Sequence, residues 1–301
     1  MPKKLCVSFK MKEELLNRMQ TKLRMEETAE IAQGALPTFM IIGAMKSGTS
    51  SLHYWLDKHP EIFMSQPKEV NYFNDPNYGQ HDLCWYRSHF RTDKKVIGES
   101  TTGYSKFPSG GPVNERLHSI LPDLKLIYIV RDPLRRIYSH FVHVMMDNLR
   151  EPDLQVLYSQ LYPASHIINC SRYHMQLERY LKCYPLKQIK VICFEEMLKN
   201  KEKTLKDVYR FLKVDDLFQC ALDDRRANDK ITQYQLHLNG RRGFAADDDP
   251  EKHAAIKEIL TKDFEEIQLL KKIPGKTLKL LQQDVHALRQ LTGMTFSEWL
   301  L

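Results

Sequence analysis

A run of small residues around one lysine is the part of this sequence best suited to binding a phosphate group. It follows an apolar segment and precedes a segment of helical pattern, and its members are Gly43, Lys46, Ser47, Gly48, Thr49, Ser50 and Ser51. Small residues let the backbone curl so that successive N–H groups point inward, and a following helix adds its N-terminal dipole. Lys46 adds a full positive charge. The run therefore predicts a phosphate-binding loop, the alternative being an ordinary strand–helix turn with a surface lysine.

The place of the lysine bears on which phosphate ligand binds. The P-loop of nucleoside-triphosphate enzymes reads G-x-x-x-x-G-K-[ST], with its lysine on the β- and γ-phosphates. Gly43 and Gly48 have that spacing, but Thr49 stands in the lysine position and Lys46 comes before the second glycine. This displacement disfavours an ATP- or GTP-dependent kinase, which remains the alternative.

A second apolar run, Leu126–Val130, is followed by Arg131, Asp132 and Pro133. Such a strand with an aspartate at its end could be the magnesium-binding strand of a nucleotide kinase. The arginine directly before Asp132 and the proline directly after it fit an ion-paired strand end better than a metal ligand.

Alternating strands and helices are expected to position these residues. Apolar runs predict strands at 38–43, 95–98, 125–130 and 189–194, and periodic segments predict helices at 50–58, 113–121, 134–148, 171–183 and 203–212. Strands that alternate with helices indicate a three-layer α/β fold around a parallel sheet. After about residue 222 the strand patterns stop, 225–249 is polar, and 250–301 is expected to be helical.

Composition and charge narrow the class of protein. The chain has 301 residues, 42% of them hydrophobic and 28% charged, and a formal net charge of +7. The hydrophobic and charged fractions are typical of a globular protein with a buried core. The positive net charge favours anionic ligands, but the sequence has no dense run of basic residues of the kind that binds nucleic acid. We expect one domain over 37–301, preceded by a helical extension over 1–36 that packs on the domain or on a second copy of the chain in a homodimer. The alternative is a helix that lies on a membrane surface, which the acidic residues of the extension disfavour.

The sequence also carries expectations about location. No apolar run approaches the ~20 residues that span a bilayer, and the N-terminal stretch has no apolar segment typical of a secretory signal. The six cysteines are scattered, without metal-ligand or paired spacing. We therefore expect reduced cysteines, no membrane span and a cytoplasmic protein.

Several motifs in order resemble the sulfotransferase family, whose members use 3′-phosphoadenosine-5′-phosphosulfate (PAPS) and release 3′-phosphoadenosine-5′-phosphate (PAP). The Lys46-Ser-Gly-Thr loop resembles their 5′-phosphosulfate loop, and Arg131-Asp-Pro with Ser139 resembles their 3′-phosphate motif. Lys68-Glu-Val-Asn-Tyr-Phe resembles the acidic motif of the carbohydrate, heparan-sulfate-type branch. Ser171-Arg-Tyr-His is similar to a later helix whose tyrosine, here Tyr173, faces the nucleotide. The resemblance covers roughly residues 39–212 and implies a P-loop-like phosphosulfate loop.

The resemblance implies roles for particular residues. Glu69 would be the general base that takes the acceptor's proton, and Lys46 with the loop amides would stabilise charge on the bridging oxygen. Glu99 is a second carboxylate near the end of a predicted strand, for which a positioning or ion-pair role is favoured over catalysis. Part of the family has a lysine at the next position, where this chain has Ser100. Lys68 is a candidate for that missing charge.

Further residues are candidates for binding the nucleotide. Arg131 and Ser139 are expected to hold its 3′-phosphate and Tyr173 to contact it, and Arg241 with Arg242 in a late basic turn is expected to close over it, with Lys230 behind. His53, His140, His143 and His174 could act as bases, but their spacing selects none of them.

The sequence thus predicts a metal-independent, PAPS-dependent sulfotransferase acting on a saccharide or small-molecule acceptor. A nucleotide kinase and a non-catalytic nucleotide-binding protein of the same fold are the alternatives. The intact Glu69 argues against the second of these.

Overall fold

A parallel sheet of five strands forms the centre of the structure, a computed structural model that describes residues 34–147, 154–220 and 266–301. The strands are β1 (Phe39–Gly43), β2 (Ile62–Met64), β3 (Val96–Ser100), β4 (Lys125–Val130) and β5 (Ile189–Cys193), in the order β2-β3-β1-β4-β5. In the register of the sheet, Met40 of β1 lies between Glu99 of β3 and Leu126 of β4. Every residue of β1 is buried, as expected for a continuous apolar run in a sheet covered on both faces.

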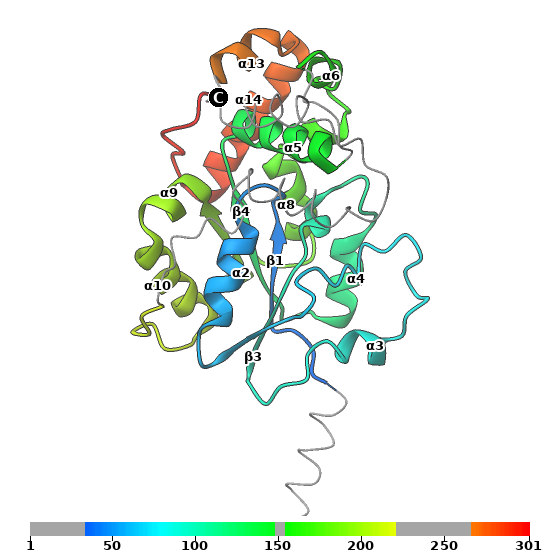
Figure 1. Ribbon diagram of the computed structural model, residues 1–301, viewed down its shortest axis with the longest axis vertical. Coiled ribbons are helices and arrows are strands. Elements are labelled where there is room, and N and C mark those ends of the chain that lie inside the picture. Colours follow the sequence, from blue (N-terminus) through cyan, green and yellow to red (C-terminus); the bar gives the residue numbers. More distant parts are fainter. Residues whose placement is uncertain (1–33, 148–153, 221–265) are drawn as a thin grey trace, which may run out of the picture.

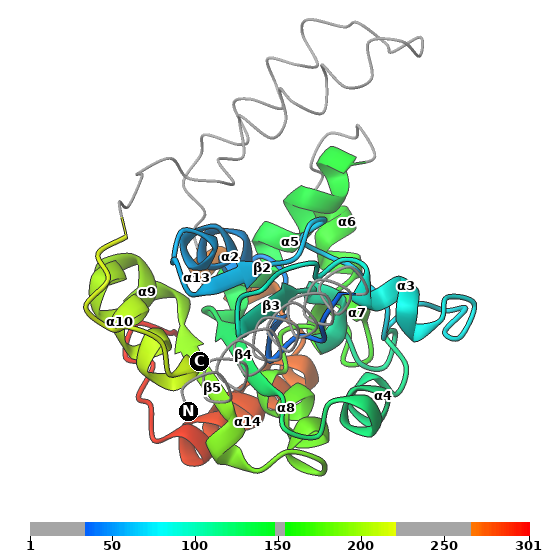
Figure 2. The ribbon, with the colours of Figure 1, turned by 90° about the horizontal axis from the view of Figure 1, so that it is seen from below.

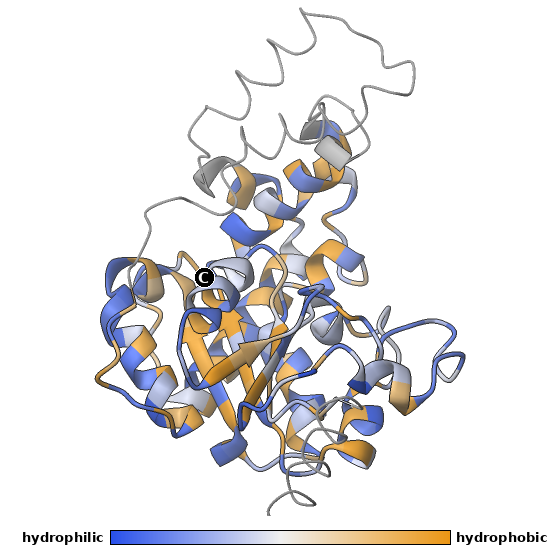
Figure 3. Ribbon diagram, turned by 60° about the horizontal axis from the view of Figure 1, so that its bottom comes forward, coloured by the Kyte–Doolittle hydropathy of each residue, from blue (hydrophilic) through white to orange (hydrophobic). Residues whose placement is uncertain are grey.

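Helices cover both faces of the sheet (Figures 1 and 2). One face carries α2 (Thr49–Asp57), α9 (Phe194–Lys199) and α10 (Lys201–Leu212), and the other carries α4 (Val113–Ile120), α8 (Tyr173–Leu181) and α14 (Gly275–Thr292). Successive strand residues point to opposite faces, so that Ile127 and Ile129 contact the first set of helices while Tyr128 contacts the second. The three-layer α/β architecture is confirmed, and Figure 3 shows the hydrophobic strands at its centre.

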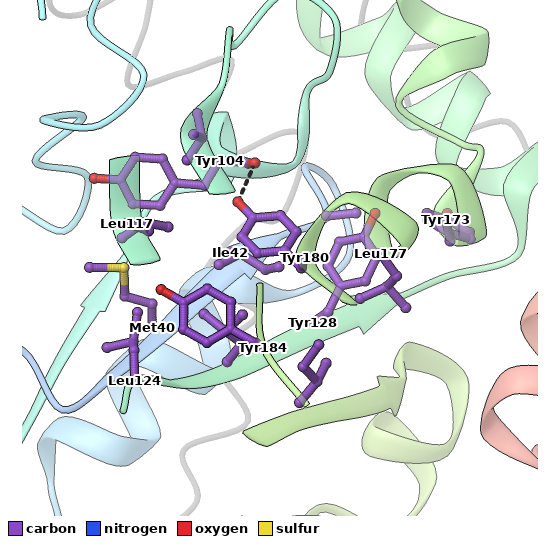
Figure 4. Close-up of a cluster of buried hydrophobic side chains, with 14 of the residues drawn as sticks. Met40, Ile42, Tyr104, Leu117, Leu124, Tyr128, Tyr173, Leu177, Tyr180 and Tyr184 are labelled. Carbon is purple, nitrogen blue, oxygen red and sulfur yellow. Dashed lines mark hydrogen bonds between the residues drawn. The ribbon is translucent and has the colours of Figure 1, made fainter. Parts of the chain in front are cut away.

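The core on the α8 side is rich in tyrosine (Figure 4). Tyr104, Tyr128, Tyr173, Tyr180 and Tyr184 are all buried there. Their hydroxyls need partners because an unpaired polar group in an apolar core is costly. Tyr180 accordingly donates to the carbonyl of Tyr104 at 2.7 Å.

A third cluster lies beyond the carboxyl ends of the strands. It forms around α5 (Pro133–Asp147) with α6 (Leu154–Ser159), α7 (His166–Asn169) and α13 (Glu266–Lys272). Leu281 of α14 belongs to this cluster, whereas Val285 and Leu288 of the same helix pack in the core beneath the sheet. Helix α14 therefore packs both against the cluster around α5 and against the sheet.

The remaining short elements are α3 (Leu83–Arg87), the 3-10 helix η1 (Thr102–Ser105) and the 3-10 helix η2 (Leu186–Gln188). The four strands and five helices expected from the sequence lie within a few residues of their predicted positions. Strand β2, with three residues, is too short for a recognisable pattern, and the short helices α3, α6, α7, α9, η1 and η2 were also not predicted. Helices α13 and α14 lie within 250–301, which was expected to be helical. Of the predicted extension 1–36, only 34–36 lie among the described residues, where the amide of Ala35 donates to the carbonyl of Phe90 at 3.0 Å.

Candidate active site

The loop between β1 and α2 curls where the sequence predicts it. Lys46 and Gly48 have left-handed backbone angles, with φ of 69° and 84°. A Cβ atom at Gly48 would lie 2.7 Å from the ring of Phe194, and one at Gly43 would overlap the hydroxyl of Ser105. Glycine is therefore required at both ends of the loop, because a side chain would displace packed neighbours.

The inside of this loop has unused hydrogen-bonding groups. Helix α2 begins after Gly48 with no side-chain cap and no acidic residue in its first turn, so its first amides and dipole favour an anion. Ser47 is fully buried, and its hydroxyl has no hydrogen-bond partner among the described residues. Ser50 and Ser51, both half-buried, lie in the first turn of the helix. Buried polar groups are nearly always paired, and a phosphate in this loop would supply the missing acceptor.

Arg131 is attached to the same loop. It follows β4, and its Nη1 donates to the carbonyl of Lys46 at 3.0 Å while its guanidinium lies 4.9 Å from the ring centre of Phe194. The Nε is buried without a partner among the described residues. Burial lowers the pKa of Arg131, an effect that the nearby Glu195 opposes. The guanidinium thus has a donor left for a further acceptor.

The carboxylate of Asp132 accepts hydrogen bonds from two backbone amides. Its Oδ1 accepts from the amide of Arg135 at 2.9 Å, which caps α5, and its Oδ2 accepts from the amide of Leu300 at 3.4 Å. Burial raises the pKa of its carboxyl, and these hydrogen bonds oppose the shift. With both oxygens engaged, Asp132 fits a helix cap rather than the magnesium ligand of a nucleotide kinase.

Ser139 and Tyr173 are the two other described residues that were expected to bind the nucleotide. Ser139 is buried on α5, eight residues after Arg131. Tyr173 is fully buried, and its hydroxyl donates to the carbonyl of Arg131 at 2.7 Å. Tyr173 therefore holds the end of β4, and its direct contact with a nucleotide stays a prediction. Arg241, Arg242 and Lys230 lie outside the described residues.

Glu69 lies across from the loop, beside Lys68. The Nζ of Lys68 is 2.9 Å from Oε1 of Glu69 and 3.4 Å from the hydroxyl of Thr49, the first residue of α2. The hydroxyl of Thr102 donates to both carboxylate oxygens of Glu69, at 3.3 and 3.2 Å. About 36% of the Glu69 side chain is exposed, so it stays accessible to a substrate. The structure thus brings the predicted base and the predicted phosphate loop together through one lysine.

Glu99 has a different environment. It is fully buried, and its carboxylate accepts hydrogen bonds from the hydroxyls of Tyr86, Thr101 and Tyr104. Burial raises the pKa of Glu99, while the three hydroxyls oppose the shift. Three hydroxyl donors hold this side chain, an arrangement that fits the positioning role among the two roles expected for it. Glu99 is therefore shielded from solvent and organises the core around it.

The four candidate histidines have different surroundings, with His143 on α5 and His174 on α8 both half-buried. His53 lies one helical turn after Thr49, and burial together with Lys68 lowers its pKa to about 4 although Glu69 opposes the shift. Its Nδ1 is buried without a partner among the described residues. His140 is buried on α5 beside Arg136, and burial followed by that positive charge lowers its pKa to about 2. Both are neutral at pH 7, and of the two only His53 interacts with Glu69.

Sequence reasoning missed three residues that support the site. Thr102 binds Glu69, as described above; its only signal was its place just after a strand. Glu195 of α9 accepts from the amide of Asp132 at 2.9 Å and from the indole of Trp299 at 3.1 Å. Trp299 lies 104 positions from Glu195 in the sequence, so no local pattern could indicate this contact.

A family model for the sulfotransferase domain matches residues 36–240. The chain belongs to the sulfotransferase family. It is 38% identical over 158 residues to the membrane-associated sulfotransferase kil1 of Dictyostelium discoideum, over 50% of this chain and 32% of that protein. It is 28% identical over 221 residues to human heparan sulfate glucosamine 3-O-sulfotransferase 5, over 69% of this chain and 59% of that enzyme.

A third relative is the bifunctional heparan sulfate N-deacetylase/N-sulfotransferase of Drosophila melanogaster, 27% identical over 62% of this chain and 20% of that protein. The chain thus spans less than two thirds of the length of each of these relatives. Its fold is also that of a sulfotransferase from Alicyclobacillus acidocaldarius, with a TM-score of 0.56 and 23% identity over 76% of this chain and 98% of the other.

Within the described ranges, no helix has the length and apolar character to cross a bilayer. Across those same ranges, no three His, Cys, Asp or Glu side chains gather into a group that could hold a metal ion. A metal-independent reaction stays a prediction.

Proposed function

We propose that this protein is a PAPS-dependent sulfotransferase that transfers a sulfuryl group to a hydroxyl or amine of a saccharide or small-molecule acceptor. The observation that carries the proposal is the contact of Lys68 with both Glu69 and Thr49, which joins a candidate base to a loop suited to phosphate. Membership of the sulfotransferase family supports it independently.

The residues present fit PAPS. The loop has an uncapped helix start and a buried, unpartnered hydroxyl on Ser47, both suited to the 5′-phosphosulfate. The unpartnered Nε of Arg131 is suited to the 3′-phosphate, because a guanidinium binds phosphate oxygens with charge-assisted hydrogen bonds. When bound, PAPS supplies the sulfuryl group.

The chain's own residues then have separate tasks. Lys46, Ser47 and the first amides of α2 would hold the phosphosulfate and stabilise the charge that grows on its bridging oxygen. Arg131 and Ser139 would hold the 3′-phosphate. Glu69 would take the proton of the acceptor, with Thr102 fixing the orientation of its carboxylate.

The acceptor and the location of the protein are finer proposals. Two of the relatives described above are named for heparan sulfate, which favours a saccharide acceptor for this chain. A cytoplasmic location and a homodimer remain predictions from the sequence. The first is weakened because kil1 is described as membrane-associated.

The test compares ligands in thermal unfolding. PAP at 100 times its dissociation constant should add about 2.7 kcal/mol of stability, and ATP with Mg²⁺ should add none. Release of PAP from PAPS in the presence of desulfated heparan-type oligosaccharides then measures transfer. Stabilisation by ATP with Mg²⁺ alone would support the kinase alternative, and binding of PAP without turnover on any saccharide or small hydroxyl acceptor would support the non-catalytic one.

A further inference from the structure

Lys68 is held at the carboxyl edge of the sheet by its backbone. Its carbonyl accepts from the hydroxyl of Ser65 at 3.2 Å and from the amide of Ser100 at 3.4 Å, so that it is fixed between the ends of β2 and β3. Its side chain extends from there towards α2 and is only 23% exposed. The ammonium group is therefore confined to the space between the phosphate loop and Glu69.

The two partners of this ammonium group belong to the two sides of the proposed reaction. Thr49 ends the loop that would bind the donor, and Glu69 is the base that would face the acceptor. In an in-line transfer the sulfuryl group passes between donor and acceptor. A cation that contacts both the donor loop and the base lies next to that path.

We propose that Lys68 binds the transferring sulfuryl group, and that in doing so it leaves its ion pair with Glu69 and frees that carboxylate to act as a base. This inference rests on the proposed function. It makes Lys68 a further catalytic residue, and it makes the strength of the base depend on the presence of the donor. Without PAPS, Glu69 stays paired with Lys68.

A lone pair of the acceptor oxygen forms the new bond to sulfur, and the proton of that oxygen passes to Glu69. The bond from sulfur to the bridging oxygen breaks, and its electron pair remains on the 5′-phosphate of PAP. Lys68 keeps its protons throughout and offsets negative charge on the sulfuryl oxygens, where a fixed positive charge stabilises the transferring group.

Neighbouring groups are less suited to this task. Ser100 is fully buried at the end of β3 and carries no charge. Arg131 reaches the loop at the carbonyl of Lys46, after β4, whereas β3 and Lys68 lie on the other side of β1. His53 lies near Lys68 and Glu69, but it is neutral at pH 7 because burial and Lys68 lower its pKa to about 4.

The experiment measures the binding of PAPS and of PAP, without acceptor, by titration calorimetry. PAP lacks only the sulfuryl group, so the ratio of its dissociation constant to that of PAPS reports contacts with that group. Lys68→Met should weaken PAPS binding by about tenfold to a hundredfold, the range for a hydrogen bond to a charged group, and leave PAP binding nearly unchanged. Lys68→Gln is a second neutral variant should Lys68→Met fail to fold.

Two further variants separate this role from a structural one. Glu69→Gln removes the partner of Lys68 in the free protein, so it should keep or increase the preference for PAPS. Lys182→Met, at an exposed lysine after α8, should bind both ligands as the unmodified protein does.

The outcomes distinguish this inference from the proposed function. If the unmodified protein binds neither nucleotide, the proposed function itself fails. If it binds both and the neutral Lys68 variants keep the same ratio, Lys68 does not contact the sulfuryl group and the inference is overturned. Equal weakening of PAPS and PAP would overturn it too, since Lys68 would then bind the 5′-phosphate alone.

Discussion

Two carboxylates close to each other in this fold have opposite surroundings, and at the residue scale this difference separates their roles. Glu69 is accessible and held by Lys68 and the hydroxyl of Thr102. Glu99 is fully buried and receives three hydroxyl hydrogen bonds. A base must reach the proton that it takes. Accessibility therefore favours Glu69, and burial assigns Glu99 to the core.

The corresponding prediction compares the two amides. Glu69→Gln keeps the size of the side chain but removes its basicity, so turnover should fall by ~10²–10⁴ while PAP binding stays close to normal. Glu99→Gln places an NH₂ group among hydroxyl donors and should cost about 1–3 kcal/mol of unfolding free energy with little change in turnover. Turnover under saturating PAPS and urea denaturation measure the two effects. The reverse order would assign the base to Glu99.

At the scale of elements, the end of β4 is held by three other parts of the fold. Helix α8 contributes the hydroxyl of Tyr173, α9 contributes Glu195, and Leu300 contributes its amide to Asp132. Trp299 donates to the same Glu195 and lies near the ring of Tyr173. These contacts fix the backbone from which Arg131 extends, so a nucleotide binding there would meet an oriented guanidinium.

The variant Arg131→Ala tests whether this guanidinium binds the 3′-phosphate of the nucleotide. If Arg131 holds the 3′-phosphate, PAP should bind about 1.5–3 kcal/mol more weakly, the value of a hydrogen bond to a charged group. AMP, which has no 3′-phosphate, should bind almost as before. Arg210→Ala, on the outer side of α10, is the control for loss of an exposed arginine. Equal losses for PAP and AMP would mean that Arg131 only shapes the loop through the carbonyl of Lys46.

The elements themselves were largely predictable because each has its own pattern. Apolar runs gave β1, β3, β4 and β5, and the small residues around Lys46 gave the phosphate loop. Strand β2 was missed because Ile62–Met64 is too short to have a period. The reach of Lys68 to Thr49 and the bond from Trp299 to Glu195 were not predictable either, since they join segments that only tertiary packing brings together.

At the scale of the whole molecule, helix α14 connects the cluster of helices around α5 to the core of the sheet. Its Leu281 packs in the cluster around α5, and its Val285 packs in the core beneath the sheet. Between them, Asp284 accepts hydrogen bonds from the amides of His174 and Met175, both at 3.0 Å. These amides belong to the first turn of α8, where the backbone N–H groups have no partner within their own helix. Asp284 of α14 therefore caps the start of α8.

This cap should give stability a particular dependence on pH. Burial raises the pKa of Asp284 from 3.8 to about 6, although the two amides and Arg172 oppose the shift. The folded protein therefore binds this proton more tightly than the unfolded chain does. The contribution of Asp284 to stability is then greatest at low pH and falls as the pH rises from about 4 to about 6, by up to about 3 kcal/mol.

Asp284→Asn keeps an acceptor oxygen for one amide but cannot ionise, so it should lack this dependence. Urea denaturation between pH 4 and pH 7 measures the difference in unfolding free energy between the unmodified protein and the variant. That difference should move in favour of the variant as the pH rises. Asp123→Asn, at an exposed carboxylate, should show no such trend. If the difference instead moved towards the unmodified protein with rising pH, the amides and Arg172 would outweigh burial, and the ionised carboxylate would be the form that joins α14 to α8.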